Sequence, residues 1–299
     1  MTDAPAVGEQ TLCDESPNGV APNDVTVGAE VGIAEASEST CDLGIETTRD
    51  AFLDGAVMVL QPKRGYRAGI DAVFLAADAQ PQESRARITL HDAGAGVGTV
   101  GLLAAYRLRK QTQVHITLLE RAPELAELAE RNARDNALHE CIRVVCADFL
   151  GPMANLEAAG LARESFDLVL TNPPFHIDTR GTLSADKVKA DAHAMGEGDL
   201  ERWARAMARM TRPGGEIIVV HKAEALASLL AALAPRFGAL RIMPLFPRLG
   251  EPASRILVKG VKGSRAPLAL LPGTPLHNDG NAFNSAATAI LRQGAGLWL

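Results

Sequence analysis

The chain has 299 residues, of which 47% are hydrophobic, so it contains ample apolar material for a large core. It lacks an apolar run of about 18 residues, which a membrane helix needs, and it lacks the basic and apolar regions of a signal peptide. Its four cysteines show neither a disulfide framework nor a metal-ligand spacing, so we expect a cytoplasmic protein with reduced thiols and no metal.

The formal net charge of −6 is distributed unevenly along the chain. Residues 1–50 carry eleven acidic residues and one basic residue, whereas residues 51–299 carry 25 acidic and 29 basic ones. Residues 1–48 show no hydrophobic periodicity and are predicted to form a disordered acidic tail, because they cannot bury enough apolar area to fold. Residues 49–299 are predicted to form a single domain, whose mildly basic body permits a polyanionic partner without requiring one.

The domain begins with a predicted strand at 56–60, a turn at 61–65 and a helix at 70–79. Strands and helices then alternate. The strands are expected at 88–91, 114–119, 142–146, 166–170, 216–220, 241–246 and 255–261, and the helices at 97–109, 123–137, 199–210 and 223–233. This order predicts a largely parallel sheet with helices on both faces. The turn at 247–250 is too short for a crossover helix, so one edge pair should be antiparallel.

A glycine-rich turn, Asp92-Ala93-Gly94-Ala95-Gly96-Val97-Gly98, follows the strand at 88–91 and opens a helix. Glycines at such a turn let the backbone approach a ligand closely, and the helix N-terminus presents N–H groups to it. The spacing Gly96-x-Gly98-x-x-Gly101 also fits the dinucleotide fingerprint, and Glu120 stands where a ribose-binding carboxylate is expected. Both NAD and S-adenosylmethionine are therefore candidate cofactors.

Three features favour S-adenosylmethionine. Asp92, directly before the glycines, would repel a pyrophosphate but neutralise the methionine ammonium. Asp148 and Phe149 follow the strand at 142–146 and offer a carboxylate and a ring to an adenine. The loop after the next strand, Asn172-Pro173-Pro174-Phe175, has no role in hydride transfer. Each feature also has a structural alternative: Asp92 and Asp148 as helix caps, Glu120 as a solvated strand end, and the loop as a simple turn.

The Asn-Pro-Pro-Phe loop indicates the acceptor. Two prolines remove two backbone donors and make the loop stiff. What remains are acceptors, the Asn172 side-chain oxygen and the Pro173 carbonyl, beside an aromatic ring. Such a corner suits a planar NH2 group, whose two N–H bonds the acceptors take while Phe175 stacks on the attached ring. No general base is needed, although His176 is a nearby candidate.

These motifs resemble the class I S-adenosylmethionine-dependent methyltransferases that alkylate exocyclic or amide nitrogens. The chain is more closely similar to the bacterial tRNA(Val) adenine-N6 methyltransferase group. That similarity also rests on QPKRGYRAGIDAVFLA at 61–76, GDLxxW at 198–203, FPRLG at 246–250, KGSRAP at 262–267 and LHNDGNAF at 276–283. It spans roughly residues 52–299, and the acidic tail lies outside it.

The resemblance implies an α/β Rossmann-like methyltransferase fold with a mostly parallel seven-stranded sheet and one antiparallel edge strand. It implies that residues 49–85 form a hairpin and helix that close over the cofactor. By position, it assigns Asp92, Gly94 and Gly96 to the methionine end of S-adenosylmethionine, Glu120 to the ribose, Asp148 and Phe149 to the adenine, Tyr66 and Asp71 to the closing segment, and Asn172, Pro173 and Phe175 to the target base. We expect Pro174 to contact the substrate and Arg248, Arg255, Lys259, Lys262 and Arg265 to contact phosphates.

The implied function is methyl transfer to the exocyclic N6 of an adenine in tRNA, the adenine 3′ of the anticodon of tRNA(Val). The enzyme alternatives are a protein glutamine N5-methyltransferase and a ribosomal RNA guanine-N2 methyltransferase, since both substrates also present a planar NH2 group. A further alternative is a module that binds S-adenosylmethionine or RNA without catalysis.

Overall fold

The computed structural model describes residues 36–40, 45–65, 67–80, 86–173, 198–278 and 280–299. The chain divides into two units, Met1–Ile33 and Ala34–Leu299, and every described residue belongs to the second. In this part of the chain no helix is both long and apolar enough to span a bilayer.

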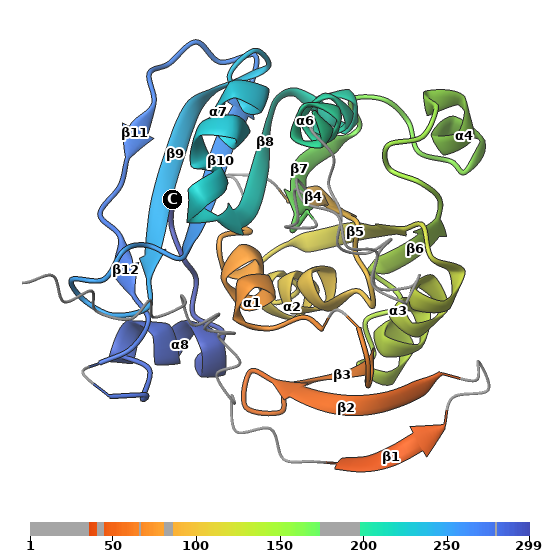
Figure 1. The fold of residues 1–299 in the computed structure, drawn as a ribbon. Coiled ribbons are helices and arrows are strands. Elements are labelled where there is room, and N and C mark those ends of the chain that lie inside the picture. Colours follow the sequence, from red (N-terminus) through yellow and green to blue (C-terminus); the bar gives the residue numbers. More distant parts are fainter. Residues whose placement is uncertain (1–35, 41–44, 66, 81–85, 174–197, 279) are drawn as a thin grey trace, which may run out of the picture. The chain divides into compact units, whose positions relative to one another are not determined.

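The second unit is built on a nine-stranded sheet (Figure 1). Its strands run in the order β11-β9-β10-β8-β7-β4-β5-β6, and β12 pairs with β9. The strand bounds are β4 (Arg87–Ala93), β5 (Gln113–Glu120), β6 (Ile142–Cys146), β7 (Phe166–Thr171), β8 (Thr211–Lys222), β9 (Phe237–Phe246), β10 (Arg255–Lys262), β11 (Ala269–Leu270) and β12 (Thr274–Pro275). The strands β4 to β8 are mutually parallel where they pair.

The predicted α/β methyltransferase fold, with a mostly parallel sheet and one antiparallel strand, is confirmed. The antiparallel strand is β10, and it lies between β8 and β9 rather than at the edge. The crossover from β8 to β9 leaves a gap one strand wide, and the short turn after β9 returns the chain into that gap. The two-residue strands β11 and β12 extend the seven long strands beyond β9.

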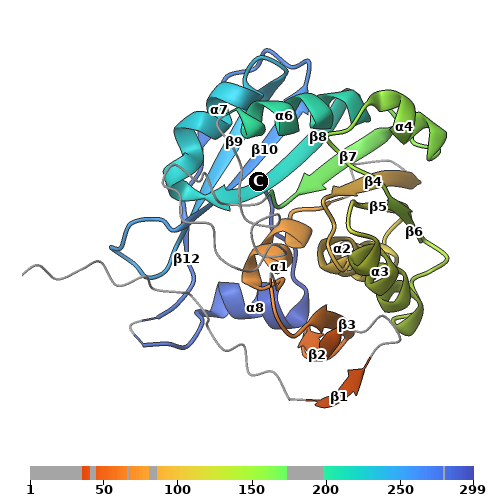
Figure 2. The ribbon, with the colours of Figure 1, turned by 45° about the vertical axis from the view of Figure 1, so that its right-hand side comes forward.

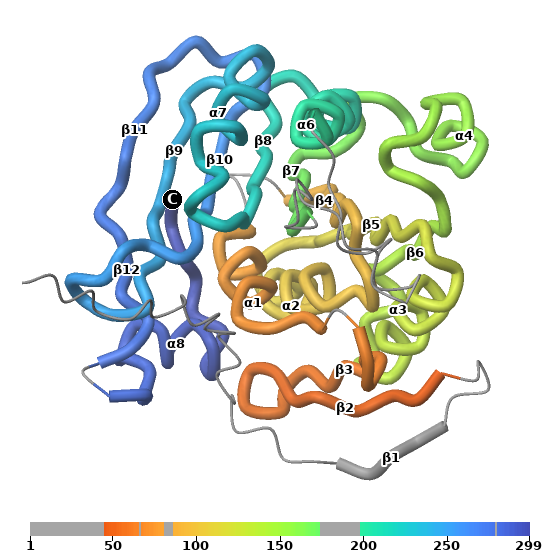
Figure 3. The backbone as a smooth tube through the Cα atoms, viewed as in Figure 1, coloured from red at the N-terminus to blue at the C-terminus, as the bar shows by residue number. Residues whose placement is uncertain are grey.

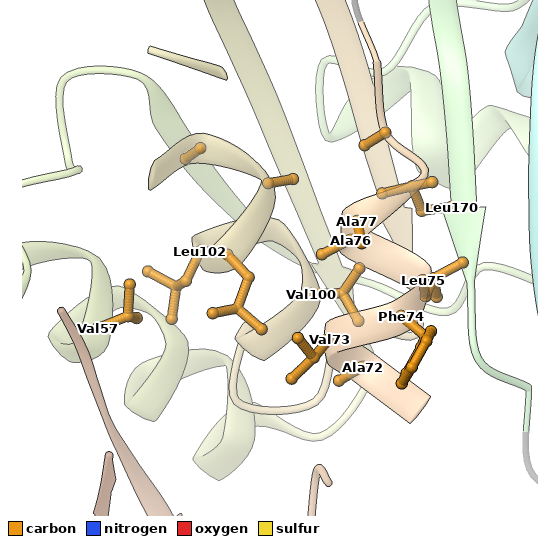
Figure 4. Packing of buried hydrophobic residues seen from close by; sticks show 14 of the residues in the cluster. Val57, Ala72, Val73, Phe74, Leu75, Ala76, Ala77, Val100, Leu102 and Leu170 are labelled. Carbon is orange, nitrogen blue, oxygen red and sulfur yellow. The ribbon is translucent and has the colours of Figure 1, made fainter. Parts of the chain in front are cut away.

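Helices cover both faces of the sheet (Figure 2). One face carries α1 (Ile70–Ala77), α2 (Thr99–Leu108), α3 (Pro123–Asp135) and α8 (Ser285–Gln293). The other carries α4 (Met153–Ala158), α6 (Asp199–Met210), the short helix η1 (Ala223–Ala225) and α7 (Leu226–Leu233). Each layer has its own hydrophobic core cluster. Helix α1 is apolar nearly all round, so it is buried, and Figure 4 shows its side chains between Val100 of α2 and Leu170 of β7.

A separate three-stranded antiparallel sheet contains β1 (Ala36–Thr40), β2 (Glu46–Phe52) and β3 (Val57–Pro62). The backbone trace in Figure 3 shows β3 beside α3. Regular structure therefore extends into the segment 1–48 that the composition predicts to be disordered. The buried side of β2 is polar and carries no hydrophobic signal, because Asp50 is 4% exposed and accepts hydrogen bonds from Gln61 and Arg67. Residues 1–35 and 41–44 lie outside the described part.

Asn132 of α3 fastens this sheet to the rest of the unit. Its side chain is fully buried, and its Oδ1 accepts the backbone N–H of Leu60 at 2.7 Å. Its Nδ2 donates to the carbonyls of Leu60 and Val97, both at 3.0 Å. One turn later, Asn136 makes the same pair of bonds with Met58 of β3. The amide of Asn132 therefore joins the edge of β3 to the residue that follows Gly96.

Replacing Asn132 by Ala should destabilise the protein by roughly 2–4 kcal/mol, because it leaves a buried N–H and two buried carbonyls without partners. The midpoint of urea unfolding measures this. The control is Asn155→Ala, which replaces an exposed asparagine on α4. It should change the free energy of unfolding by no more than about 0.5 kcal/mol. Equal effects of the two substitutions would show that Asn132 does not hold β3.

Candidate active site

The strand register brings the ends of β4, β5 and β7 together. Ala93 of β4 pairs with Leu119 of β5 on one side and with Thr171 of β7 on the other. Adjacent strands lie about 4.8 Å apart. The residues that follow therefore leave the same edge of the sheet side by side: Gly94, Glu120 and Asn172. The chain also reverses its direction of winding here, since β5 and β6 lie on one side of β4 and β7 on the other. Open α/β sheets bind ligands in the crevice at such a switch point.

The glycines after β4 have different surroundings. Gly94 has φ +71°, and a Cβ at this position would lie 2.9 Å from Cη2 of Trp203. A Cβ at Gly101 would lie 2.2 Å from Leu118, so that glycine allows α2 to pack against β5. Only at Gly96, among these three, is there no described atom within 4 Å of an added Cβ. Gly96 is thus where the backbone faces space that a ligand could use.

Glu120 holds the glycine turn from the neighbouring strand. Its side chain is buried, with 8% of the residue exposed, so it is not a solvated strand end. Oε2 accepts the backbone N–H of Gly96 at 2.9 Å, and Oε1 accepts that of Ala122 at 2.9 Å. The carboxylate therefore connects the turn to the start of α3, and each oxygen keeps a further lone pair for a hydroxyl donor.

Asp92 lies one residue inside the end of β4 and is only 1% exposed. Its Oδ2 accepts the backbone N–H of Gly101 at 2.9 Å, which is the helix-capping contact of the structural alternative. Burial raises the pKa of Asp92 to about 7, the Gly101 bond opposes this, and the negative charge of Glu120 adds to it. A cation beside Asp92 would therefore be strongly favoured, because it would offset both burial and repulsion.

Asp148 and Phe149 diverge after β6. Asp148 is exposed, and its Oδ1 accepts the backbone N–H of Leu150 at 2.9 Å. Phe149 is 4% exposed, and its ring centroid lies 5.1 Å from that of Trp203 and 5.6 Å from that of His91. The ring thus packs in the core beneath α6, and its contact with an adenine stays a prediction. An apolar ring at this strand end is more stable under the helix than in water.

Trp203, like Thr171 and Asn132, is a residue at this site whose role the sequence motifs did not indicate. Its indole packs on Gly94 and on Phe149, so α6 covers the turn after β4. The only signal for it was the GDLxxW motif at 198–203, which opens α6.

The loop after β7 starts beside the glycine turn. The hydroxyl of Thr171 is fully buried and donates to the Ala93 carbonyl at 2.9 Å, which fixes the strand end. Asn172 is half-buried and Pro173 is buried. Pro174, Phe175 and His176, like Tyr66, lie outside the described residues.

The remaining predicted residues are divided between two edges of the sheet. Asp71 forms an ion pair with Arg255 at 2.9 Å, which joins the start of α1 to the start of β10. Arg248 follows β9 on the same edge as Asn172, and it donates to Oδ1 of Asn281 at 3.0 Å. Lys262 ends β10 at the opposite edge, separated by the length of β7, roughly 17 Å.

The expected group of phosphate contacts is therefore not a single surface. Arg265 lies just beyond Lys262 and is exposed, so it too is at the far edge. Lys259 is nearly buried between Asp78, at 3.7 Å, and Glu216, at 3.4 Å. The physical reason is that β10 is antiparallel, so its C-terminal end, with Lys262, lies at the edge where β8 and β9 begin, opposite to Arg248.

The family model for the methyltransferase small domain matches residues 72–243, which include the glycine turn, Glu120 and the Asn172 loop. The chain belongs to this family. Its fold is similar to the crystal structure of a predicted O-methyltransferase, protein Atu636 from Agrobacterium tumefaciens, with a TM-score of 0.63. The two sequences are 31% identical, and the match covers 77% of this chain and 99% of that chain. No curated protein matches the chain significantly in sequence.

Two more distant structures are also similar. One is a putative class I S-adenosylmethionine-dependent methyltransferase from Listeria monocytogenes, with 14% identity, 74% and 66% of the two chains covered, and a TM-score of 0.48. The other is the tRNA (m1A58) methyltransferase TrmI from Aquifex aeolicus, with 12% identity, 68% and 72% covered, and a TM-score of 0.47.

S-adenosylmethionine is the methyl donor of this methyltransferase family. The described residues fit it, because Gly96 faces open space, Glu120 has lone pairs for hydroxyls, and Asp92 favours a neighbouring cation. Within the described part of the methyltransferase, no three His, Cys, Asp or Glu side chains gather into a group that could hold a metal ion.

We expect the affinity of the methyltransferase for S-adenosylmethionine to fall as pH is lowered from 7 to 5. The pKa of Asp92 is raised to about 7, and a cofactor ammonium beside it would lower that pKa. Binding below pH 7 must then release a proton, so the affinity should fall by up to about tenfold per pH unit. Titration calorimetry in buffers of different ionisation enthalpy measures the affinity and the number of protons released on binding. A pH-independent affinity would mean that Asp92 only caps α2.

Glu120→Gln should weaken binding of S-adenosylmethionine by about 10- to 100-fold. One carboxylate oxygen becomes an NH2 group, which then faces the backbone N–H of Gly96 or Ala122 as donor against donor. The measurement is the dissociation constant by calorimetry. Glu124→Gln, an exposed acid in the first turn of α3, is the matched control and should bind normally. Unchanged affinity of the Glu120 variant would remove this residue from the cofactor site.

Proposed function

We propose that this methyltransferase transfers a methyl group to the exocyclic N6 of an adenine in tRNA, the adenine 3′ of the anticodon of tRNA(Val). The observation that carries the proposal is the register of β7 on β4. Because Thr171 is opposite Ala93, Asn172 and Pro173 begin directly beside the glycine turn. The Thr171 hydroxyl holds the two strand ends together at 2.9 Å.

The chemistry asked of the loop is positioning. When bound, S-adenosylmethionine supplies a methyl group on a sulfonium, which is already an activated donor. The Asn172 oxygen and the Pro173 carbonyl accept the two N–H bonds of the adenine amino group and direct the nitrogen lone pair toward the donor. They stabilise the positive charge that develops on nitrogen, which lowers the barrier more than it strengthens ground-state binding. Proline rigidity keeps these acceptors in place without further ordering.

An O-methyl acceptor is the competing possibility, because the printed name of protein Atu636 is a predicted O-methyltransferase. A hydroxyl group offers one proton to an acceptor, whereas an NH2 group offers two. Two adjacent acceptors therefore favour the amino group. A hydroxyl would also need a base to remove its proton, and neither Asn172 nor Pro173 supplies one.

The choice of RNA rests on charge and on the accessibility of the target base. Residues 51–299 carry more basic than acidic residues, which suits a polyanion. On the edge that carries Asn172, Arg248 is a partly exposed cation, paired with Glu251 at 3.5 Å, that could meet a backbone phosphate. An adenine must be unpaired and unstacked to reach the loop, as in an anticodon arm. A glutamine amide or the N2 of a ribosomal RNA guanine would present the same NH2 group.

Asn172→Ala should lower kcat by about 10²- to 10³-fold, because one of the two acceptors is lost, while the affinity for S-adenosylmethionine stays unchanged. Initial rates with unmodified tRNA and labelled S-adenosylmethionine measure kcat. Calorimetry measures the affinity for S-adenosylmethionine. Asn155→Ala, the exposed asparagine of α4, should keep full activity. Loss of cofactor binding in place of turnover would refute the assigned role of Asn172.

The substrate itself is tested by mass spectrometry of nucleosides from tRNA of a strain that lacks the gene. The expected result is the loss of N6-methyladenosine from tRNA(Val) and its return after incubation with the purified protein. Separate incubations with ribosomal RNA, DNA and protein fractions distinguish the alternatives. Methylation of a protein glutamine, of a guanine or of a ribose hydroxyl would overturn the proposal, and no transfer to any fraction would favour a non-catalytic module.

A further inference from the structure

A basic cavity of about 450 Å³ lies at the edge of the sheet opposite to the candidate active site. It is lined by the segment before β7, the second half of α6, the residue before β9 and the end of β10. The length of β7, roughly 17 Å, separates it from Asn172. Five of its lining side chains are cationic: Arg163, Arg205, Arg209, Arg236 and Lys262. The cavity is thus distinct from the cofactor crevice, and nothing in the methyl-transfer chemistry uses it.

Four of the five cations already have carboxylate partners. The pairs are Arg163 with Glu157 at 3.3 Å, Arg205 with Glu201 at 3.4 Å, Arg236 with Glu201 at 2.5 Å, and Lys262 with Glu164 at 2.7 Å. Two of these cations share one acid, so the described carboxylates do not neutralise the cavity.

Lys262 has a structural role besides its ion pair. Its ammonium donates to the carbonyls of Ala208 and Thr211 at 2.6 and 2.7 Å, which satisfies the C-terminal end of α6. These bonds also offset the negative end of the helix dipole, which would otherwise repel an anion from the cavity.

Arg209 differs from the other four. Among the described residues it has no acidic partner, and its one hydrogen bond is a long one, 3.4 Å from Nη2 to the Phe149 carbonyl. Its Nε is buried and has no acceptor among the described atoms. Burial and the positive charges of Arg163 and Arg205 lower the pKa of Arg209. Arginine nevertheless stays protonated, so its positive charge is not neutralised by any described carboxylate. A bound anion would accept a hydrogen bond from the buried Nε and would neutralise the positive charge.

We propose that this cavity binds a phosphate group, with Arg209 at its centre and Arg163 and Arg205 at its rim. Guanidinium groups present N–H donors in a planar fork that matches the oxygens of a phosphate. Three of them, approaching from the segment before β7 and from α6, suit a tetrahedral dianion better than a single planar carboxylate. The phosphate could belong to a small phosphorylated compound or to the backbone of a bound RNA. The proposal does not depend on which group the protein methylates.

The test compares the wild type with Arg209→Gln, using inorganic pyrophosphate and a labelled oligouridine as probes at low salt. Oligouridine contains no adenine, so its binding is independent of the proposed methyl acceptor. The matched control is Arg134→Gln, an exposed arginine of α3 that pairs with Glu130. Calorimetry follows pyrophosphate, and fluorescence anisotropy follows the RNA. Thermal unfolding and S-adenosylmethionine affinity are measured for every variant.

We expect Arg209→Gln to weaken saturable binding of at least one probe by about tenfold or more, and Arg134→Gln to change neither. A loss for pyrophosphate alone identifies a site for small phosphates, and a loss that includes oligouridine identifies a backbone contact. Should Arg209→Gln fail to fold, Arg163→Gln, on an exposed side chain, replaces it with the same expectation. No saturable binding of either probe, or equal effects of the cavity variant and the control, would overturn the proposal.

Discussion

The pairing of Ala93 with Leu119 on one side and Thr171 on the other is the constraint from which the rest of the site follows. Parallel strands place residues of equal register at the same height, so one pairing decides which side chains share the crevice. A slip of one residue in β7 would turn Asn172 to the other face. The fully buried bond from the Thr171 hydroxyl to the Ala93 carbonyl opposes such a slip, because breaking it would leave buried polar groups without partners.

The glycine turn is held from three directions, each by a different kind of contact. Glu120 binds the N–H of Gly96 from β5, Asn132 binds the carbonyl of Val97 from α3, and Trp203 of α6 packs on Gly94. The hydrogen bonds fix the direction of the peptide groups, and the indole excludes water from one side. The turn is therefore preorganised, and no described atom lies within 4 Å of a Cβ added at Gly96. Preorganisation lowers the cost of binding, since little conformational freedom remains to be lost.

Charged groups of opposite sign gather at the two edges of the sheet. Asp92 is buried, and burial together with the negative charge of Glu120 raises its pKa, so a cationic ligand beside Asp92 would relieve this cost. At the far edge the sign is reversed, because Arg209 stands near Arg163 and Arg205 and has no acidic partner among the described residues. Helix α6 connects the two regions, since it carries Trp203 near its start and Arg209 near its end. Both regions hold charge that the described residues do not fully compensate.

The sequence by itself determined the order of the long strands and helices, the family, the cofactor and the glycine turn, because these depend on local periodicity and on contiguous motifs. Tertiary structure alone decided which residues meet. Phe149 follows a strand end, as expected, but α6 covers it and its ring joins the core. Arg248 and Lys262 are close in sequence, yet the antiparallel direction of β10 sends them to opposite edges. The strand β2 was not apparent from the sequence either. Its buried Asp50 accepts hydrogen bonds from residues eleven and seventeen positions away. Local patterns specify elements, whereas the direction of a strand and the cover of a helix arise from long-range packing that no short segment encodes.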